Sequence, residues 1–107
     1  MTISAKPRKI TATALNGEVL TRRTARTYSH ACYLEFTYSD GTVENSDASW
    51  AGHPDLAEKN LKKGRESAAR LQGTEVNSWD QEKRVYVGTG IFCEKVRAVA
   101  VPVNLGA

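Results

Sequence analysis

Tyr28-Ser-His-Ala-Cys-Tyr-Leu-Glu-Phe-Thr-Tyr38 is the stretch of sequence that decides the fold. It is rich in aromatic and β-favouring residues, and Ser39-Asp40-Gly41-Thr42 follows it as a typical tight turn. We therefore expect a long strand over residues 28–38 and an antiparallel return over residues 43–46. Side chains alternate across a strand. One face carries Tyr28, His30, Cys32, Leu34, Phe36 and Tyr38 and is the predicted core face. The other face, with Glu35, is predicted to point to solvent.

A hairpin is predicted before this strand. Two β-favouring segments, residues 10–15 and 18–23, flank Asn16-Gly17, which is typical of a type I′ turn with two positive φ angles. Residues 1–9 are polar and basic without periodicity, so we expect a flexible lead-in there. The folded domain is then residues 10–107, a length suited to one core.

A helix is predicted after the strands, over about residues 54–72. Pro54 suits the first helical position, Asp55 favours the positive end of the helix dipole, and Gly73 is a plausible stop. Small and apolar residues recur at helical spacing and should face the sheet: Ala57, Leu61, Gly64, Ala68 and Leu71. Gly64 within this stripe predicts a close approach between helix and sheet.

The last third of the chain reads as a polar stretch over residues 74–81 and two further strands, over residues 83–87 and 91–101. Gly88-Thr-Gly90 is interpreted as the turn between them, and Pro102 should end the second strand or lie on a sheet edge. The predicted class is α+β, with an antiparallel sheet of four to six strands and one α-helix packed on one face.

Charge is segregated along the chain, although the net charge is only +3. The first 30 residues contain six cations and a single acid, Glu18, whereas residues 27–57 contain no Lys or Arg and five acids. Such a layout concerns partners rather than fold.

No residue set predicts catalysis, a metal site or a cofactor. His30, Cys32, His53 and Cys93 lack the local spacing of zinc ligands, and the two cysteines are expected to be reduced, buried residues. We expect no enzyme activity and no cofactor. No apolar run is long enough to span a membrane and no signal peptide is evident, so we expect a cytoplasmic protein.

Two partner surfaces are predicted. The acidic strand pair can contact a basic groove on a host protein or nucleoprotein complex through Glu35, Asp40, Glu44 and Asp47. The alternative is nucleic-acid binding, provided that the basic hairpin and the helix lie on one side, through Arg22, Arg23, Arg26, Lys59, Lys62 and Lys63. Trp50 and Trp79 lie in polar contexts, where each can be either an interface residue or a lid on the core.

The segments Arg23-Thr-Ala-Arg-Thr-Tyr28-Ser-His30-Ala, Ser49-Trp50 and Pro54-Asp-Leu56-Ala-Glu-Lys59 carry a further indication. Over residues 22–63 the chain resembles small uncharacterised accessory proteins encoded by bacterial viruses. The resemblance implies a small host-directed protein, such as a counter-defence inhibitor of the anti-CRISPR type, which blocks a host assembly by binding it in the host cytoplasm. It assigns no functional residue.

Overall fold

Seven strands and one helix make up residues 6–104, the part of the chain that the computed structural model describes. In chain order they are β1 (Arg8–Thr13), β2 (Val19–Thr24), β3 (His30–Tyr38), β4 (Val43–Asn45), β5 (Ser49–Ala51), α1 (Pro54–Leu71), β6 (Glu75–Asp80) and β7 (Val85–Pro102). The five strands β3 to β7 form an antiparallel sheet in the order β4-β3-β7-β6, with β5 also paired to β3, and β1 and β2 form a separate hairpin. The predicted α+β class is confirmed.

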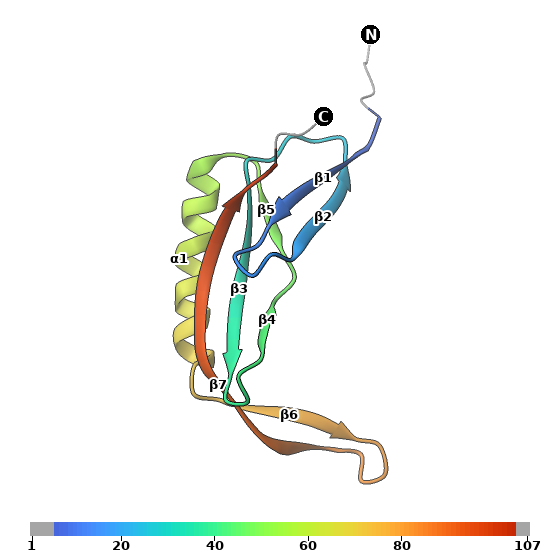
Figure 1. Cartoon of the computed structure of the whole chain (residues 1–107), viewed down its shortest axis with the longest axis vertical. Helices are drawn as coiled ribbons and strands as arrows, with labels where there is room; N and C mark the ends of the chain where they lie inside the picture. The colour runs from blue at the N-terminus through green and yellow to red at the C-terminus, as the bar shows by residue number, and fades with distance from the viewer. Residues whose placement is uncertain (1–5, 105–107) are drawn as a thin grey trace.

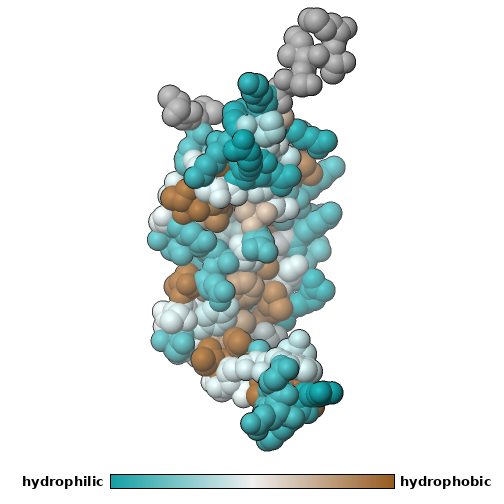
Figure 2. Space-filling model, turned by 90° about the vertical axis from the view of Figure 1, so that its right-hand side faces the viewer, coloured by the Kyte–Doolittle hydropathy of each residue, from teal (hydrophilic) through white to brown (hydrophobic). Residues whose placement is uncertain are grey.

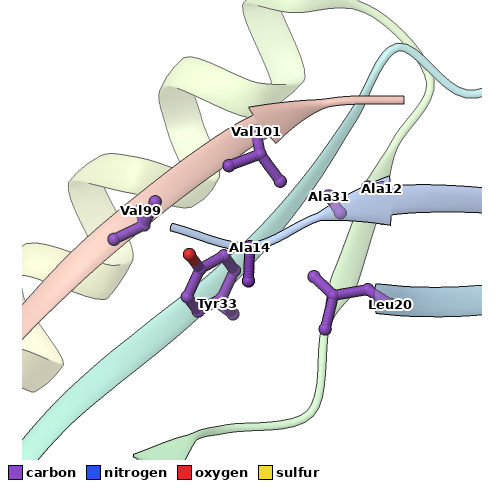
Figure 3. Packing of buried hydrophobic residues seen from close by; sticks show 7 residues of the cluster. All are labelled: Ala12, Ala14, Leu20, Ala31, Tyr33, Val99 and Val101. Atoms are coloured by element: carbon purple, nitrogen blue, oxygen red, sulfur yellow. The ribbon is translucent and has the colours of Figure 1, made fainter. Parts of the chain in front are cut away.

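Strand β3 is covered on both faces. The even-numbered face, including Cys32, packs beneath α1, as the sequence predicts. The opposite face, predicted to meet solvent, is also buried around Ala31 and Tyr33, because the β1–β2 hairpin packs over it (Figures 1 and 3). The Oη atom of Tyr33 accepts a hydrogen bond from the Leu15 N–H at 3.0 Å, which satisfies the polar tip of this buried ring. The fold therefore has three layers, helix, sheet and hairpin.

The β1–β2 hairpin turns through three residues rather than the predicted two. Ala14 N–H donates to the Glu18 carbonyl (2.8 Å), and Gly17 N–H donates to the Ala14 carbonyl (2.9 Å). Only Gly17 in this loop has a positive φ, +90°, so the turn is of type I followed by a glycine bulge, and the predicted type I′ turn is wrong. Strand β1 starts at Arg8, inside the predicted lead-in; residues 1–5 of that lead-in lie outside the described residues.

Helix α1 has the predicted start and end. His53 is the N-cap, and its Nδ1 atom accepts a hydrogen bond from the Leu56 N–H at 3.2 Å. Pro54 is the first helical residue, and Gly73, with φ of +86°, follows the C-cap and reverses the chain. These local signals explain why the helix bounds could be predicted so closely.

Gly64 brings the helix into close contact with the sheet. A Cβ atom at this position would lie 2.8 Å from the Cβ of Ala98 on β7, which is shorter than a normal carbon contact. The predicted close approach is confirmed, and the glycine–alanine pair sets the distance between α1 and β7.

The last third of the chain departs from the prediction. Residues 75–80, predicted as an irregular polar stretch, form β6, and the two predicted strands are one strand of 18 residues, β7. The Gly88-Thr-Gly90 segment is a bulge within β7 and not a turn, because the Glu75 carboxylate accepts from the Gly90 N–H (3.1 Å) and Thr89 Oγ1 donates to the Val76 carbonyl (2.7 Å). Pro102 ends β7, as predicted.

The β6–β7 hairpin projects from the body as an arm. Figure 1 shows β6 and the first half of β7 continuing past the end of α1. The radius of gyration is 17.0 Å, whereas a compact domain of this length has a radius of about 13 Å. We refer to residues 75–92 as the arm.

Candidate protein-interaction surface

The arm carries exposed aromatic and aliphatic side chains. Trp79 on β6 and Tyr86 on β7 are directly opposite each other, with ring centroids 5.0 Å apart at an edge-to-face angle of 68°. Trp79 is 49% exposed and Tyr86 is 71% exposed. Val85, Val87 and Phe92 are exposed as well. Large apolar side chains of this number on a projecting hairpin are typical of an interaction surface.

The tip of the arm is held by hydrogen bonds. Asp80 Oδ1 accepts from the N–H groups of Glu82 (3.0 Å) and Lys83 (3.1 Å), and the Asp80 carbonyl accepts from the Arg84 N–H (2.8 Å). The Nε1–H of Trp79 donates to Gln81 Oε1 at 2.9 Å. These bonds orient the Trp79 ring before any partner binds, which lowers the ordering cost of binding.

Two of the four predicted acidic residues, Asp40 and Glu44, lie near the turn of the β3–β4 hairpin, whose residue Ser39 is bonded to the base of the arm. Ser39 N–H donates to the Phe92 carbonyl, and Phe92 N–H donates to Ser39 Oγ, both at 2.9 Å. Asp40 follows in the turn, where hydrogen bonds from the Thr42 hydroxyl and N–H hold the pKa of its carboxyl below the usual value. Glu44 is exposed on β4. Asp40 and Glu44 therefore lie in the same hairpin as Ser39, the residue that bonds the Phe92 backbone at the base of the arm.

Glu44 also has a local partner. Its Oε2 atom accepts a hydrogen bond from the Tyr38 hydroxyl at 3.0 Å. Partial burial, together with this carboxylate, raises the pKa of Tyr38 to about 12. The phenol therefore stays protonated and donates to Glu44 throughout the neutral range.

Glu35 does not point to solvent, contrary to the sequence interpretation. Its side chain is 11% exposed, and Oε1 lies 2.6 Å from Nε of Arg97 on the neighbouring strand β7. Glu35 lies on β3, as predicted, but Arg97 compensates its negative charge within the fold. Asp47 is exposed in the β4–β5 connection, away from the turn that holds Asp40 and Glu44. The four predicted acids thus do not form one accessible cluster.

The two predicted basic sets lie on opposite faces of the sheet. The β1–β2 hairpin, which carries Arg22 and Arg23 and is followed by Arg26 in the β2–β3 connection, packs on one face (Figure 1). Helix α1, which carries Lys59, Lys62 and Lys63, packs on the other. The condition for a shared phosphate-binding surface, both elements on one side, is therefore not met. Figure 2, which looks onto the hairpin side, shows hydrophilic residues gathered at the hairpin end and at the arm tip, with hydrophobic patches between them.

The guanidinium group of Arg22 contacts an aromatic ring of the same chain. This group lies 5.1 Å from the ring centroid of Tyr28, and that ring meets Trp50 edge-to-face at 6.4 Å. Trp50 is a partly buried residue of β5 packed against the hairpin cluster. Of the two roles predicted for the tryptophans, Trp50 therefore has that of a lid on the core. Trp79 is exposed on the arm, where an interface residue is expected.

The cysteines lie in separate core clusters. Cys32 lines a hollow of about 260 Å³ between α1 and the β4–β5 connection, and burial raises the pKa of its thiol. A raised pKa keeps the thiol protonated at neutral pH, which is unfavourable for nucleophilic chemistry. Within residues 6–104, no three His, Cys, Asp or Glu side chains lie close enough to hold a metal ion. Nor does this range contain a helix that meets the length and hydropathy of a membrane span.

The sequence does not predict the arm, because its first strand has an unusual composition. The segment Glu75-Val-Asn-Ser-Trp-Asp80 contains four polar or charged residues. Only Val76 and the pairing with Val85-Tyr-Val87 indicate a strand. Polar residues suffice here because neither face of the hairpin is covered by the body at Ser78 to Asp80.

Comparison with protein-family models, with curated proteins and with solved structures finds no match to this chain.

Proposed function

We propose that this chain is a non-enzymatic protein-binding module that docks on a larger host protein or nucleoprotein complex through its arm. The observation that carries the proposal is the exposed Trp79–Tyr86 pair on a hairpin that stands away from the core. Tryptophan and tyrosine are enriched among residues that dominate binding energy. A two-stranded ribbon gains little stability from such exposed rings by itself, so a partner that covers them is the favoured explanation.

The acidic residues Asp40 and Glu44 indicate what kind of partner the surface fits. The hairpin that carries Asp40 and Glu44 is bonded through Ser39 to Phe92 at the base of the arm, so a complementary partner presents an apolar pocket with basic residues at its rim. Charges at the edge of an interface increase the rate of encounter and fix orientation more than they raise affinity. A basic nucleic-acid-binding groove has this character, and occupation of such a groove by the arm would block it. This mode of action agrees with the resemblance to phage accessory proteins and with a counter-defence inhibitor of the anti-CRISPR type.

The test is affinity capture from host cells with and without nuclease, followed by mass spectrometry. Wild-type protein should retain a protein partner after nuclease treatment, whereas the double variant Trp79→Ala/Tyr86→Ala should lose it. The variant Leu15→Ala/Val19→Ala is a matched control, because both residues are exposed and apolar but lie on the β1–β2 hairpin. Charge reversal by Asp40→Lys/Glu44→Lys should weaken capture, with Glu58→Lys on the helix as its control. Equal capture by the arm variant and the wild type, with folding intact, would refute the proposal.

A second candidate function is nucleic-acid binding by the β1–β2 hairpin alone. Lys9 and Arg23 are directly opposite each other in the strand ladder, and like charges in such a pair are destabilising unless an anion lies between them. Lys9→Gln and Arg23→Gln should each flatten the salt dependence of DNA or RNA binding by about one unit. Lys59→Gln/Lys63→Gln, on the opposite face, should leave it unchanged. Absence of binding at low salt eliminates this candidate.

A further inference from the structure

Strand β7 is longer than its neighbours, so each of its edges is paired over only part of its length. Strand β6 pairs with residues 85–92, and β3 pairs with residues 93–102 on the other edge. On the β6 side, pairing ends where Cys93 N–H donates to the Thr74 carbonyl (2.8 Å), and the Gln72 side chain then accepts from the Val96 N–H (3.3 Å). At the far end, Asn104 N–H donates to the Thr11 carbonyl of β1 (2.8 Å).

The segment between these limits presents unpaired backbone groups. Alternate residues of an antiparallel strand direct their N–H and C=O groups to the same edge. Because Val96 faces the Gln72 side, Ala98 and Ala100 face it too. Among residues 6–104, the strand pairing and hydrogen bonds provide no partner on this edge for Ala98 or Ala100. Such a row is a template for an added strand.

A hollow of about 390 Å³ runs beside this edge, between α1 and β7. Its walls include Ala68 and Ala69 from the helix and Val96 and Ala98 from the strand, and Arg65 lies on its helix wall. The small alanines leave room for the side chains of an added strand. Arg65 is exposed, and within residues 6–104 the salt bridge between Glu35 and Arg97 is the only one, so Arg65 has no acidic partner there.

The charge at Arg65 decides between two kinds of occupant. A second copy of the chain, paired to this edge by a two-fold axis near Ala98, would bring both Arg65 side chains close to the axis, because the adjacent Gly64 lies against Ala98. Like charges there oppose self-pairing. An acidic segment meets no such repulsion. We propose that the edge formed by residues 96–100 binds an extended segment of a partner protein by strand addition, with an aspartate or glutamate against Arg65.

The probe is a seven-residue peptide with acetylated and amidated ends, in which glutamate and valine alternate, titrated into ¹⁵N-labelled full-length protein at low salt. The amide signals of Ala98 and Ala100 should shift, and their hydrogen exchange should slow, whereas the β4 and β6 edges should be unaffected. A matched peptide with lysine for each glutamate should bind at least about fivefold more weakly, a ratio within the range of single coupling effects.

Variants on the helix separate the site from a general charge effect. Arg65→Glu should reverse the preference, so that the lysine peptide binds more tightly than the glutamate peptide. Arg70→Glu makes the same charge change elsewhere on α1, where the Arg70 guanidinium donates to the Ser67 hydroxyl (3.2 Å). This variant should leave the preference for the glutamate peptide unchanged. Trp79→Ala/Tyr86→Ala should also leave it unchanged, which makes this site independent of the arm.

Several results would overturn the inference. They are equal binding of both peptides, shifts confined to the arm or to the β4 edge, equal effects of Arg65→Glu and Arg70→Glu, and no shift of Ala98 or Ala100 at millimolar peptide. A concentration-dependent dimer whose interface includes Ala98 would instead assign the edge to a second copy.

Discussion

Replacement of Gly64 by alanine tests how the helix is seated on the sheet. The new methyl carbon would lie 2.8 Å from the Cβ of Ala98, and carbon atoms are in optimal contact at about 3.5–4.0 Å. The helix and β7 must therefore separate locally by about 1 Å. Overpacking of this kind costs about 1–3 kcal/mol, while the better helix propensity of alanine contributes about 1 kcal/mol in favour of folding. The expected net effect is a loss of up to about 2 kcal/mol.

The sign of this effect should depend on residue 98. In an Ala98→Gly background the clashing methyl group is gone, and the next nearest atom, Cδ2 of Leu34, lies at an ordinary contact distance of 3.5 Å. Gly64→Ala should then stabilise the protein by about 1 kcal/mol through helix propensity alone. The coupling free energy between the two sites is therefore about 1–3 kcal/mol, the size of the overpacking cost.

The assay is equilibrium unfolding in urea of the wild type, both single variants and the double variant, followed by circular dichroism. For a domain of this size, 1 kcal/mol corresponds to about 4–8 °C in the thermal midpoint, so the differences are measurable. If Gly64→Ala stabilised the protein equally in both backgrounds, the close approach of α1 to β7 would be refuted.

Three other predictions concern side chains whose environments the fold defines. Arg97→Ala should lower the thermal midpoint more than Lys95→Ala on the same strand, because it leaves the nearly buried Glu35 carboxylate without its partner; equal melting of the two variants would contradict this role. The pKa of Tyr38 is raised to about 12, so the stability that its protonated form contributes is fully present below pH 10 and is lost as the pH rises towards 12; the absence of a tyrosine that ionises late, in an absorbance titration of wild type against Tyr38→Phe, would contradict the Tyr38–Glu44 contact. Cys32 and Cys93 are buried, and burial raises the pKa of Cys32, so both thiols should react with a disulfide reagent only as the protein opens; rapid labelling of the native protein would show that the core near them is accessible.

Local chemistry explains which elements could be predicted. The β3 strand, the turn at Asp40-Gly41 and the helix from Pro54 carry strong local signals, and all three occur as expected. The same holds for Gly64, whose place in an alanine-rich stripe indicated contact with the sheet before any partner residue was known.

Tertiary context explains what could not be predicted. Periodicity in β3 identifies two faces, but it does not show that a hairpin covers the second face and buries Tyr33, or that Arg97 of β7 pairs with Glu35. Glycines at 88 and 90 are typical of a turn, yet the hydrogen bonds that Thr89 and Gly90 donate to residues of β6 make the segment a bulge. The arm forms because the polar strand β6 pairs with the more apolar first half of β7. The composition of either strand alone does not reveal this pairing.

The central claim, that the arm is the surface that meets a partner, can be tested by photo-cross-linking in host cells. Tyr86 is replaced by p-benzoyl-phenylalanine in one protein, and Leu15, which is also exposed, is replaced in a second. After irradiation, position 86 should yield a covalent adduct with a host protein, and its amount should fall when Trp79→Ala is added. Adducts from position 15 alone, or none from position 86 in cells that yield adducts elsewhere on the chain, would contradict the account.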